Sequence, residues 1–310
     1  MRYVSAEGVH AALDYAKLTA RLGQAFRGEM EIPVRHHHPV ATPDGPESML
    51  LLMPAWRTGG KLGVKLVTFY PGNPARGLAT IQGVYVVLDA TTGTPELVMD
   101  GVALTLRRTA CASALAASYL ARADAAAMVM VGAGALAPHL VKAHAAARPI
   151  RRITIWNRHI ERAAALADSL RGDGFAATAS EDLEGAVRDA DVISCATMSD
   201  RPLVQGAWLK PGSHVDLVGG FKSTMREVDD ETVRRARIFV DTRAGASSEA
   251  GDLVDPISRG VISADAILAD LFDLARGWGG RETAEEVTLF KSVGTAVEDL
   301  AAAEMVLEQV

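Results

Sequence analysis

The sequence predicts an α/β fold, in which a doubly wound parallel sheet is joined to an N-terminal α+β domain. Three observations predict it. From Ala127 onward, short apolar runs alternate with amphipathic stretches of crossover-helix length, a pattern typical of a parallel sheet. The first 110 residues instead carry β-rich runs punctuated by glycine, proline and histidine. A glycine turn follows the first apolar run of the second half, where a strand is expected to pass into a helix.

The second half contains six expected strands with helices between them. Helices are predicted over 160–170 and 183–187, among strands that are expected at 127–131, 153–156, 176–179, 192–195, 214–218 and 238–241. Six strands suggest the doubly wound order, in which a dinucleotide binds at a switch point beside the strand ends. We expect the ends of the third and fourth strands, near Ser180 and Thr197, to flank that point.

The first half is expected to form a second sheet, and one long helix leads out of it. An opening helix is predicted over 5–26, with Ser5 as its N-cap. The final stretch 284–310 is also helical by pattern and is expected to pack back on this half. The other elements are strands at 49–53, 63–69 and 83–88 and a helix over 104–120. The predicted domains are residues 1–112 with 296–310, and residues 113–295.

A tight turn at Gly132-Ala133-Gly134 opens the first helix of the second domain, an alanine-rich stretch. Glycine is required where the backbone adopts a positive φ or approaches a pyrophosphate closely, and the N–H groups of the following helix face the phosphates. Small-residue turns also occur at ordinary strand-to-helix junctions, so the turn alone is a weak signal. With its context, it predicts a Rossmann-like domain that contacts a nicotinamide coenzyme through Gly132, Ala133 and Gly134.

The residues about 20 positions further on predict which coenzyme is preferred. The apolar run 153–156 ends at Asn157-Arg158, where an acidic residue would bind the ribose hydroxyl of NAD. An amide and a planar cation instead offer donors to a 2′-phosphate, and Arg162 follows Arg158 by one helical turn. Asn157, Arg158 and Arg162 therefore predict NADPH over NADH. The alternative is that the two arginines are solvated helix residues.

Composition limits the classes of partner and compartment. The chain has 310 residues, of which 49% are hydrophobic, and a formal net charge of −6. This length allows two domains with a substantial core, and the acidic balance argues against nucleic acid or an anionic membrane as a partner. No apolar stretch reaches membrane-span length, and the N-terminus lacks a secretion pattern. With only Cys111 and Cys195, both expected to be buried, the sequence predicts a cytoplasmic protein.

Three cations lie in apolar surroundings and are candidates for binding an anion. Lys65 lies in the apolar run 63–67, where strand alternation would aim its ammonium at one face of a sheet. Arg35 and Arg108 have similarly apolar neighbours. Arginine offers a carboxylate a bidentate fork, and lysine offers a point charge. The alternative is that all three are ordinary surface cations.

Two other polar clusters have simpler interpretations. The consecutive His36-His37-His38 would alternate between the faces of a strand, and no cysteine, histidine or aspartate of ligand spacing lies nearby in the sequence. No metal site is therefore predicted. The cluster Asp229-Asp230-Glu231 is interpreted as the acidic start of a helix, where negative charge is favourable to the helix dipole.

Five strings, taken in order and spacing, resemble the ornithine cyclodeaminase/mu-crystallin family over nearly the whole chain. They are Gly63-Val64-Lys65, Leu106-Arg107-Arg108-Thr109-Ala110, the Gly132/Gly134 turn, Trp156-Asn157-Arg158 and Phe290-Lys291-Ser292-Val293-Gly294. The resemblance implies that Lys65 and Arg108, with Arg35 as a third cation, hold a substrate carboxylate. Thr197 is expected beside the nicotinamide half of the coenzyme, and by the resemblance so are Val293 and Gly294.

The resemblance also implies an assembly. It implies a homodimer whose interface is the N-terminal sheet completed by the C-terminal helices, and an active site between the two domains. The domain of residues 1–112 and 296–310 would serve substrate binding and dimerisation. The domain of residues 113–295 would bind NAD(P).

Two departures from the cyclodeaminases of this family indicate the substrate. Phe221 stands where they carry an acid that engages the ornithine amine, and Leu51 stands where they carry a glutamate. Apolar side chains at both positions remove the partners that a distal ammonium needs. The loop 216–221, followed by Met225-Arg226-Glu227, is similar to that of bacterial reductases of Δ1-pyrroline-2-carboxylate and Δ1-piperideine-2-carboxylate.

The resemblance therefore implies an NADPH-dependent ketimine reductase. Hydride would pass to the C=N carbon of a cyclic imine carboxylate, which gives L-proline or L-pipecolate. Lys65 is also a candidate donor of the proton that the ring nitrogen requires, and the alternative is that it is only a carboxylate ligand. The alternative functions are an ornithine cyclodeaminase and a non-catalytic, NADPH-dependent small-ligand-binding protein of the mu-crystallin type.

Overall fold

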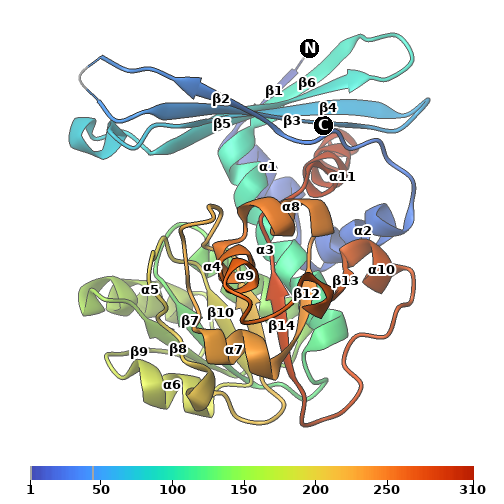
Figure 1. Ribbon diagram of the computed structural model, residues 1–310. Helices are drawn as coiled ribbons and strands as arrows, with labels where there is room; N and C mark the ends of the chain where they lie inside the picture. The colour runs from blue at the N-terminus through green and yellow to red at the C-terminus, as the bar shows by residue number, and fades with distance from the viewer. Residues whose placement is uncertain (1, 44) are drawn as a thin grey trace. The chain divides into compact units, whose positions relative to one another are not determined.

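The computed structural model describes residues 2–43 and 45–310 and separates into two compact units (Figure 1). Unit 1 comprises Met1–Arg108 and Thr295–Val310, and unit 2 comprises Thr109–Gly294. Helix α3 (Gly101–Leu120) begins in unit 1 and ends in unit 2. Unit 1 is therefore discontinuous in sequence, because its last helix comes from the end of the chain.

Unit 1 is built on a six-stranded sheet in the order β1-β6-β5-β4-β3-β2. Its strands are β1 (Arg2–Val4), β2 (His36–Val40), β3 (Ser48–Trp56), β4 (Lys61–Phe69), β5 (Ile81–Asp89) and β6 (Pro95–Asp100). Strands β2 to β6 pair antiparallel, and β1 joins β6 in parallel. The sequence predicts β3, β4 and β5, each somewhat too short, and gives no signal for β1, β2 and β6.

The helices of unit 1 differ from the prediction at the start of the chain. Instead of one helix over 5–26 there are two, α1 (Ala6–Ala12) and α2 (Tyr15–Arg27). Leu13 leaves helical geometry, and the Asp14 carboxylate starts the second helix by accepting a hydrogen bond from the Lys17 N–H at 2.9 Å. Such a cap stabilises a helix by about 1 kcal/mol over alanine, which favours a new start here. Ser5 caps α1, as predicted.

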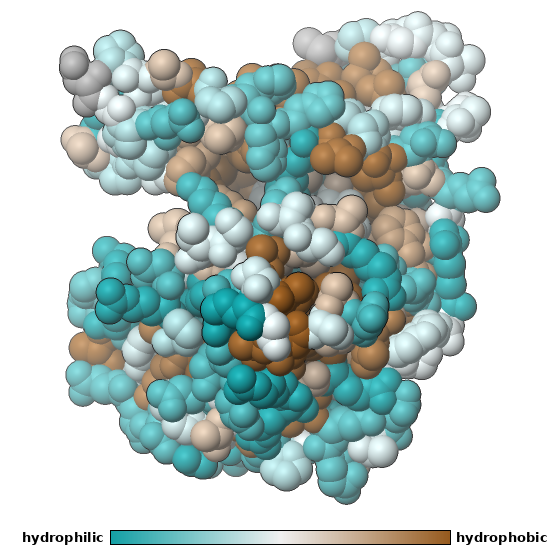
Figure 2. Space-filling model, viewed as in Figure 1, coloured by the Kyte–Doolittle hydropathy of each residue, from teal (hydrophilic) through white to brown (hydrophobic). Residues whose placement is uncertain are grey.

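The two faces of the six-stranded sheet have different neighbours. Helices α1 and α11 (Ala296–Leu307) pack on one face, and α2 packs on α11 (Figure 1). The covered face contributes buried side chains, among them Met53, Tyr85, Val87, Leu97 and Met99. The other face carries a row of directly paired, half-buried residues across four strands, namely Pro54, Val64, Val86 and Val98. Apolar side chains also show along the upper rim of this unit in Figure 2.

Unit 2 contains an eight-stranded parallel sheet in the order β13-β12-β14-β11-β10-β7-β8-β9. Its strands are β7 (Ala127–Val131), β8 (Arg152–Trp156), β9 (Ala177–Ser180), β10 (Val192–Cys195), β11 (His214–Leu217), β12 (Ala236–Val240), β13 (Ile267–Asp270) and β14 (Val287–Lys291). The run β9-β8-β7-β10-β11-β14 has the 3-2-1-4-5-6 order of a Rossmann fold, and β12 and β13 extend it. The predicted fold class is confirmed.

Helices connect these strands and cover the sheet, so the central strands are buried along their length. Every residue of β7 and β10 is buried, and Cys111 and Cys195 are buried as predicted. The helices of unit 2 beyond α3 are α4 (Ala137–Ala147), α5 (Ile160–Gly172), α6 (Leu183–Asp189), α7 (Asp230–Arg235), α8 (Arg243–Glu249), α9 (Gly251–Ser258) and α10 (Leu271–Ala275). Over the described residues, every helix is too short or too polar to cross a membrane.

The carboxyl-terminal part of the chain corrects two predictions. The strand predicted at 238–241 is β12, but β14 lies between it and β11 and takes the sixth place in the order. The prediction of one helical stretch over 284–310 is wrong, because Val287–Lys291 is a buried strand and the helix begins only at Ala296. Uniformly apolar runs occur in buried strands and in buried helices alike, so periodicity does not separate them.

The switch point of the Rossmann sheet also differs from the prediction. Strands β7 and β10 are direct neighbours, so the crevice lies at the ends of the first and fourth strands, beside Gly132 and Thr197. Strand β9, which ends at Ser180, lies at the edge of the sheet. Ser180 is therefore not part of the switch point.

Candidate active site and coenzyme site

The cations Lys65 and Arg108 meet in the interior of unit 1. Lys65 lies on β4 and Arg108 lies in the first half of α3, and their residues are 2% and 4% exposed. The Lys65 Nζ is 2.8 Å from Asp299 Oδ2, and the Arg108 Nε is 2.9 Å from Asp299 Oδ1. A second Arg108 nitrogen pairs with Glu298. The alternative that these two residues are surface cations is therefore wrong.

Glu298 and Asp299, the acidic partners, were not among the candidates from the sequence. Both lie in the first turn of α11 and are fully buried. Two adjacent carboxylates at the start of an alanine-rich, largely apolar helix are a signal that could identify them, because buried charges are rare unless they are paired. They hold Lys65 and Arg108 side by side.

A third cation, Arg35, acts on this cluster. Arg35, half-buried ahead of β2, is close enough for its charge to act on Lys65. Lys65, Arg108 and Arg35 thus face the two carboxylates Glu298 and Asp299. Burial, with the charge of Arg108, lowers the pKa of Lys65 to about 8, although Asp299 opposes this shift.

Tyr85 explains why glycine precedes Lys65 by two positions. Tyr85 is the residue of β5 directly opposite Lys65, and its ring is fully buried. A Cβ atom at Gly63 would lie 2.0 Å from the Tyr85 hydroxyl, so no larger residue fits there. Burial raises the pKa of Tyr85 well above its usual value, and the hydroxyl stays neutral. The string Gly63-Val64-Lys65 is thus a packing requirement beside a charged site.

The histidine triplet lies in β2 at the edge of the same sheet. His36, His37 and His38 are all exposed. The rings of His36 and His38 pack edge to face, with centroids 6.2 Å apart, as expected for residues on one face of a strand. Among the described residues, no group of three potential ligands is arranged to hold a metal ion.

The glycine turn after β7 has the geometry that a pyrophosphate site needs. Gly132 has a φ of 113°, and a Cβ atom there would lie 2.7 Å from the Ala196 carbonyl oxygen. A Cβ atom at Gly134 would enter open space. The segment Gly132 to Leu136 leads into α4, whose first residue, Ala137, is fully buried. The chain can therefore approach a ligand closely at Ala133 and Gly134.

The residues predicted to select the coenzyme lie where β8 ends. The Asn157 Oδ1 accepts a hydrogen bond from the His159 N–H at 2.9 Å, which orients this side chain. Arg158 lies just before α5 and Arg162 lies in its first turn, and both are exposed. Neither guanidinium forms an ion pair with another described residue. Both guanidiniums are thus accessible to solvent where β8 ends.

The residues expected near the nicotinamide are fixed by buried acids that sequence reasoning missed. The Thr197 N–H and hydroxyl both donate to Glu227 Oε1, at 2.7 and 2.8 Å. The Val293 and Gly294 N–H groups both donate to Asp241 Oδ2, at 2.7 and 2.6 Å. Asp241 directly follows β12, and Gly294 needs its glycine because its φ is 84°. Acids that end buried strands are a signal for such anchors.

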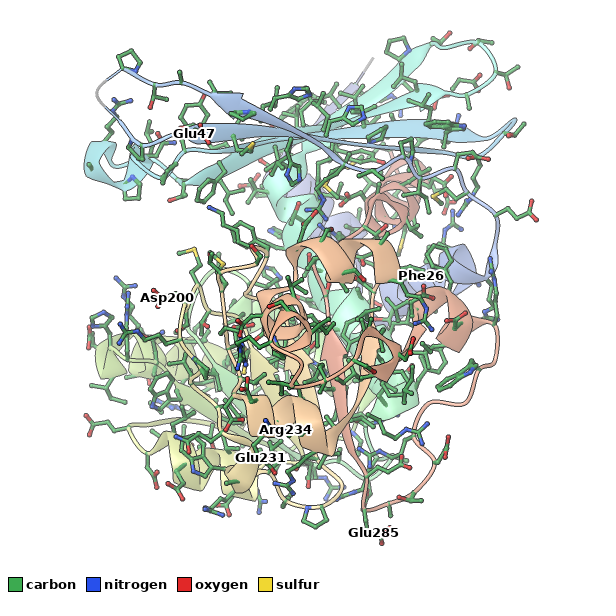
Figure 3. The ribbon with its side chains drawn as sticks, in the orientation of Figure 1. Phe26, Glu47, Asp200, Glu231, Arg234 and Glu285 are labelled. Carbon is green, nitrogen blue, oxygen red and sulfur yellow. The ribbon has the colours of Figure 1, made fainter. Side chains whose placement is uncertain are left out.

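The remaining polar clusters have structural roles. Asp229 caps α7 by accepting a hydrogen bond from the Thr232 N–H, so the helix-start interpretation of the acidic cluster is confirmed. Glu231 and Arg234 lie on the exposed side of α7, and Asp200 lies in the exposed loop after β10 (Figure 3).

Among the departures noted in the sequence, Leu51 pairs with Val67 and shares the Lys65 face of the sheet.

A Rossmann-like unit, in one chain with a buried cationic cluster, defines a protein of the NAD(P)-dependent oxidoreductase class. The sequence model of the ornithine cyclodeaminase/mu-crystallin family matches residues 4–310, and the chain belongs to this family. The family, the fold class and the assignment as an oxidoreductase, each predicted from the sequence, are confirmed.

Relatives and a solved structure match along most of the chain. A Δ1-pyrroline-2-carboxylate reductase from Paracoccus denitrificans is 42% identical over 82% of this chain and 81% of its own. The ketimine reductase mu-crystallin of Rattus norvegicus is 35% identical over 89% of this chain and 84% of its own. The structure of Thermococcus litoralis Δ1-pyrroline-2-carboxylate reductase with NADH and L-proline superposes with a TM-score of 0.94, at 31% identity, over 100% of this chain and 97% of that chain.

Proposed function

We propose that this chain is an NADPH-dependent reductase of a cyclic ketimine carboxylate, Δ1-pyrroline-2-carboxylate or Δ1-piperideine-2-carboxylate, and that it forms L-proline or L-pipecolate. The observation that carries the proposal is the buried cluster of Lys65 and Arg108, which meet at Asp299 inside unit 1, with Arg35 close enough for its charge to act on Lys65. Buried charge of this kind is unfavourable for stability and is typical of functional sites. It fits a substrate with one carboxylate.

In this proposal, Arg108, Lys65 and Arg35 bind and orient the substrate carboxylate. Glu298 and Asp299 pair with the first two side chains, so that the entropy of ordering them is lost in folding and not in binding. A substrate fixed at its carboxylate presents its imine carbon in one orientation only. Such positioning is a large part of what a protein contributes to a hydride transfer.

The coenzyme proposed for unit 2 is NADPH. When bound, the reduced nicotinamide supplies the hydride. Gly132, Ala133 and Gly134 would bind the pyrophosphate, and Thr197, Val293 and Gly294 would lie beside the nicotinamide half. Asn157, Arg158 and Arg162 would bind the 2′-phosphate, and the exposure of both arginines supports this role. The Thermococcus litoralis reductase binds NADH, so the preference for a phosphate is a proposal about the residues of this chain.

The apolar residues Leu51 and Phe221 favour an imine over ornithine. Leu51 lies on the same face of the sheet as Lys65, and the Phe221 ring lies 5.9 Å from the Lys222 ammonium. Neither side chain can pair with the distal ammonium of a diamino acid. The names of the relatives, which are reductases of Δ1-pyrroline-2-carboxylate and of ketimines, support the same substrate class.

We propose further that two copies associate through unit 1. The uncovered face of the six-stranded sheet carries the row Pro54, Val64, Val86 and Val98. A contiguous apolar sheet face is uncommon on a monomer and is typical of a subunit interface. In this proposal, unit 1 serves the substrate and the dimer, and unit 2 binds the coenzyme.

The test of this function is the loss of NADPH absorbance when an imine is added. We expect turnover with the five- or six-membered ring imine carboxylate, and none with Δ1-pyrroline, which lacks the carboxylate that the cations bind. Equal turnover of Δ1-pyrroline would contradict the role of the cluster. Conversion of ornithine to proline and ammonia with NAD+ alone would instead identify a cyclodeaminase, and tight NADPH binding without turnover would identify a binding protein.

A further inference from the structure

Unit 2 contains a buried charge cluster that the predicted coenzyme contacts do not include. It consists of Glu227, Asp252 and Lys291, and all three residues are fully buried. Glu227 lies in the loop between β11 and α7, Asp252 lies in the first turn of α9, and Lys291 is the last residue of β14. Because burying a charge is unfavourable, three such residues together call for a physical explanation.

The Glu227 carboxylate joins two loops at the carboxyl edge of the Rossmann sheet. Its Oε1 accepts hydrogen bonds from the N–H and hydroxyl of Thr197, in the loop after β10. Its Oε2 accepts from the N–H groups of Gly219 and Gly220, at 2.9 and 3.3 Å, in the loop after β11. Strands β10 and β11 are neighbours, so one side chain fixes two adjacent loops beside the switch point.

Asp252 and Lys291 support Glu227 through contacts with its backbone and its carboxylate. The Asp252 Oδ1 accepts hydrogen bonds from the backbone N–H groups of Glu227 and Val228, at 2.7 and 3.2 Å. The Lys291 Nζ lies 3.2 Å from Asp252 Oδ2 and 4.0 Å from Glu227 Oε2. Burial raises the pKa of the Glu227 carboxyl, and the charge of Lys291 opposes that shift. Glu227 is thus supported through both its backbone and its charge.

The Thr197 loop is packed on its other side against the glycine turn. A Cβ atom at Gly132 would lie 3.3 Å from Thr197 Cγ2, and one at Gly219 would lie 2.0 Å from the Thr197 carbonyl oxygen. The two glycines therefore close in on Thr197 from β7 and from β11. A shift of Thr197 by even part of an ångström would disturb both loops.

From these contacts we infer that Glu227 is a positioning residue for the nicotinamide half of the coenzyme. It holds Thr197, which is proposed to lie beside that half, and ties it to the Gly219–Gly220 loop. A carboxylate suits this role because it only accepts hydrogen bonds, and the four groups around it only donate here. The inference rests on the proposed function, since it assumes a nicotinamide coenzyme.

The experiment compares two ligands on the Glu227→Gln variant of the full chain. One is NADPH, and the other is 2′-phospho-ADP-ribose, which has the same adenosine half but no nicotinamide. The glutamine amide turns two donors toward the N–H groups of one loop, so that loop must move. We expect calorimetric titration to give an NADPH affinity about tenfold weaker and an unchanged affinity for 2′-phospho-ADP-ribose.

Glu184→Gln is the matched control, because Glu184 is an exposed glutamate of the same unit that pairs only with Arg188 on α6. It should leave both affinities unchanged. If Glu227→Gln fails to fold, Glu227→Asp keeps the charge but is too short to reach both loops, and the same selective loss is expected.

Two results would overturn the inference. One is an equal loss of affinity for both ligands, which would mean that Glu227 only supports the fold, and the other is no loss for either. If the unaltered chain bound neither NADPH nor NADH, the proposed function itself would fail, and this inference with it. The unaltered chain therefore separates the two failures.

Discussion

Arg158 is a residue whose predicted role concerns a ligand and not the packing of the fold. It is exposed, lies just before α5 and forms no ion pair with another described residue. No contact within the fold requires it, so a change there should act on a ligand and not on stability. The buried Arg108 is the opposite case, since its guanidinium pairs with Glu298 and Asp299 inside unit 1.

At the residue scale we predict that Arg158→Ala weakens NADPH binding about tenfold or more, because a charge-assisted hydrogen bond to the 2′-phosphate is lost. NADH binding should stay unchanged, since NADH has no such phosphate. Fluorescence titration with both coenzymes is the measurement. Arg171→Ala is the control, because Arg171 is an exposed arginine of α5, the helix that follows Arg158, and pairs with Asp168. Equal losses for the two coenzymes would show that Arg158 does not read the phosphate.

The sequence alone identifies the cations of the site but not their partners. Lys65 and Arg108 stand out because each lies in an apolar run, and their strings resemble a known family. Glu298 lies 190 positions after its partner Arg108, and Asp299 lies 234 positions after its partner Lys65. No local sequence feature links these acids to the cations. No local sequence feature links Glu227 to its partner Lys291 either. Long-range pairing depends on how the chain folds back, which periodicity and motifs do not encode.

At the scale of elements, the strands of unit 2 follow from the sequence as far as β12, whereas β13 and β14 were not predicted. Runs such as Ala127–Val131 are short, apolar and bounded by turn signals, so they are predicted almost to the residue. Val287–Lys291 lies in an apolar stretch that continues into α11, and the break at Gly294 is easily missed. The break between α1 and α2 is also local, because Asp14 acts as the N-cap of a new helix inside an otherwise helical pattern.

The proposed interface on the sheet face opposite α1 and α11 can be tested by a substitution in one strand. Val86 lies at its centre, paired with Val64 on β4 and Val98 on β6. We expect Val86→Arg to convert a dimer to a monomer, because a charge would be buried without a partner in the interface. Light scattering measures the mass in solution, and Val86→Ile, which keeps the face apolar, should remain dimeric. An unaltered chain that is already monomeric would contradict the proposed interface.

At the scale of the whole molecule, the chain contains two chemically different parts. Unit 1 holds a cationic cluster built from β4, α3 and α11, and unit 2 holds a Rossmann sheet with its glycine turn. The chain passes from the first to the second within α3 and returns after Gly294. The central claim is that the first part binds the substrate carboxylate while the second binds the coenzyme, so the two functions should separate on mutation.

The most direct measurement of that claim compares Arg108→Lys with Arg107→Lys. Arg107, the neighbouring residue on α3, stacks on Tyr15 and donates hydrogen bonds to His10. Lysine keeps the charge at position 108 but loses the fork that binds a carboxylate at two points. We predict that Arg108→Lys lowers kcat/KM for the cyclic imine about 100-fold and leaves the Kd of NADPH unchanged, while Arg107→Lys changes neither. An Arg108→Lys variant with normal kcat/KM, or with an equal loss in both quantities, would contradict the account.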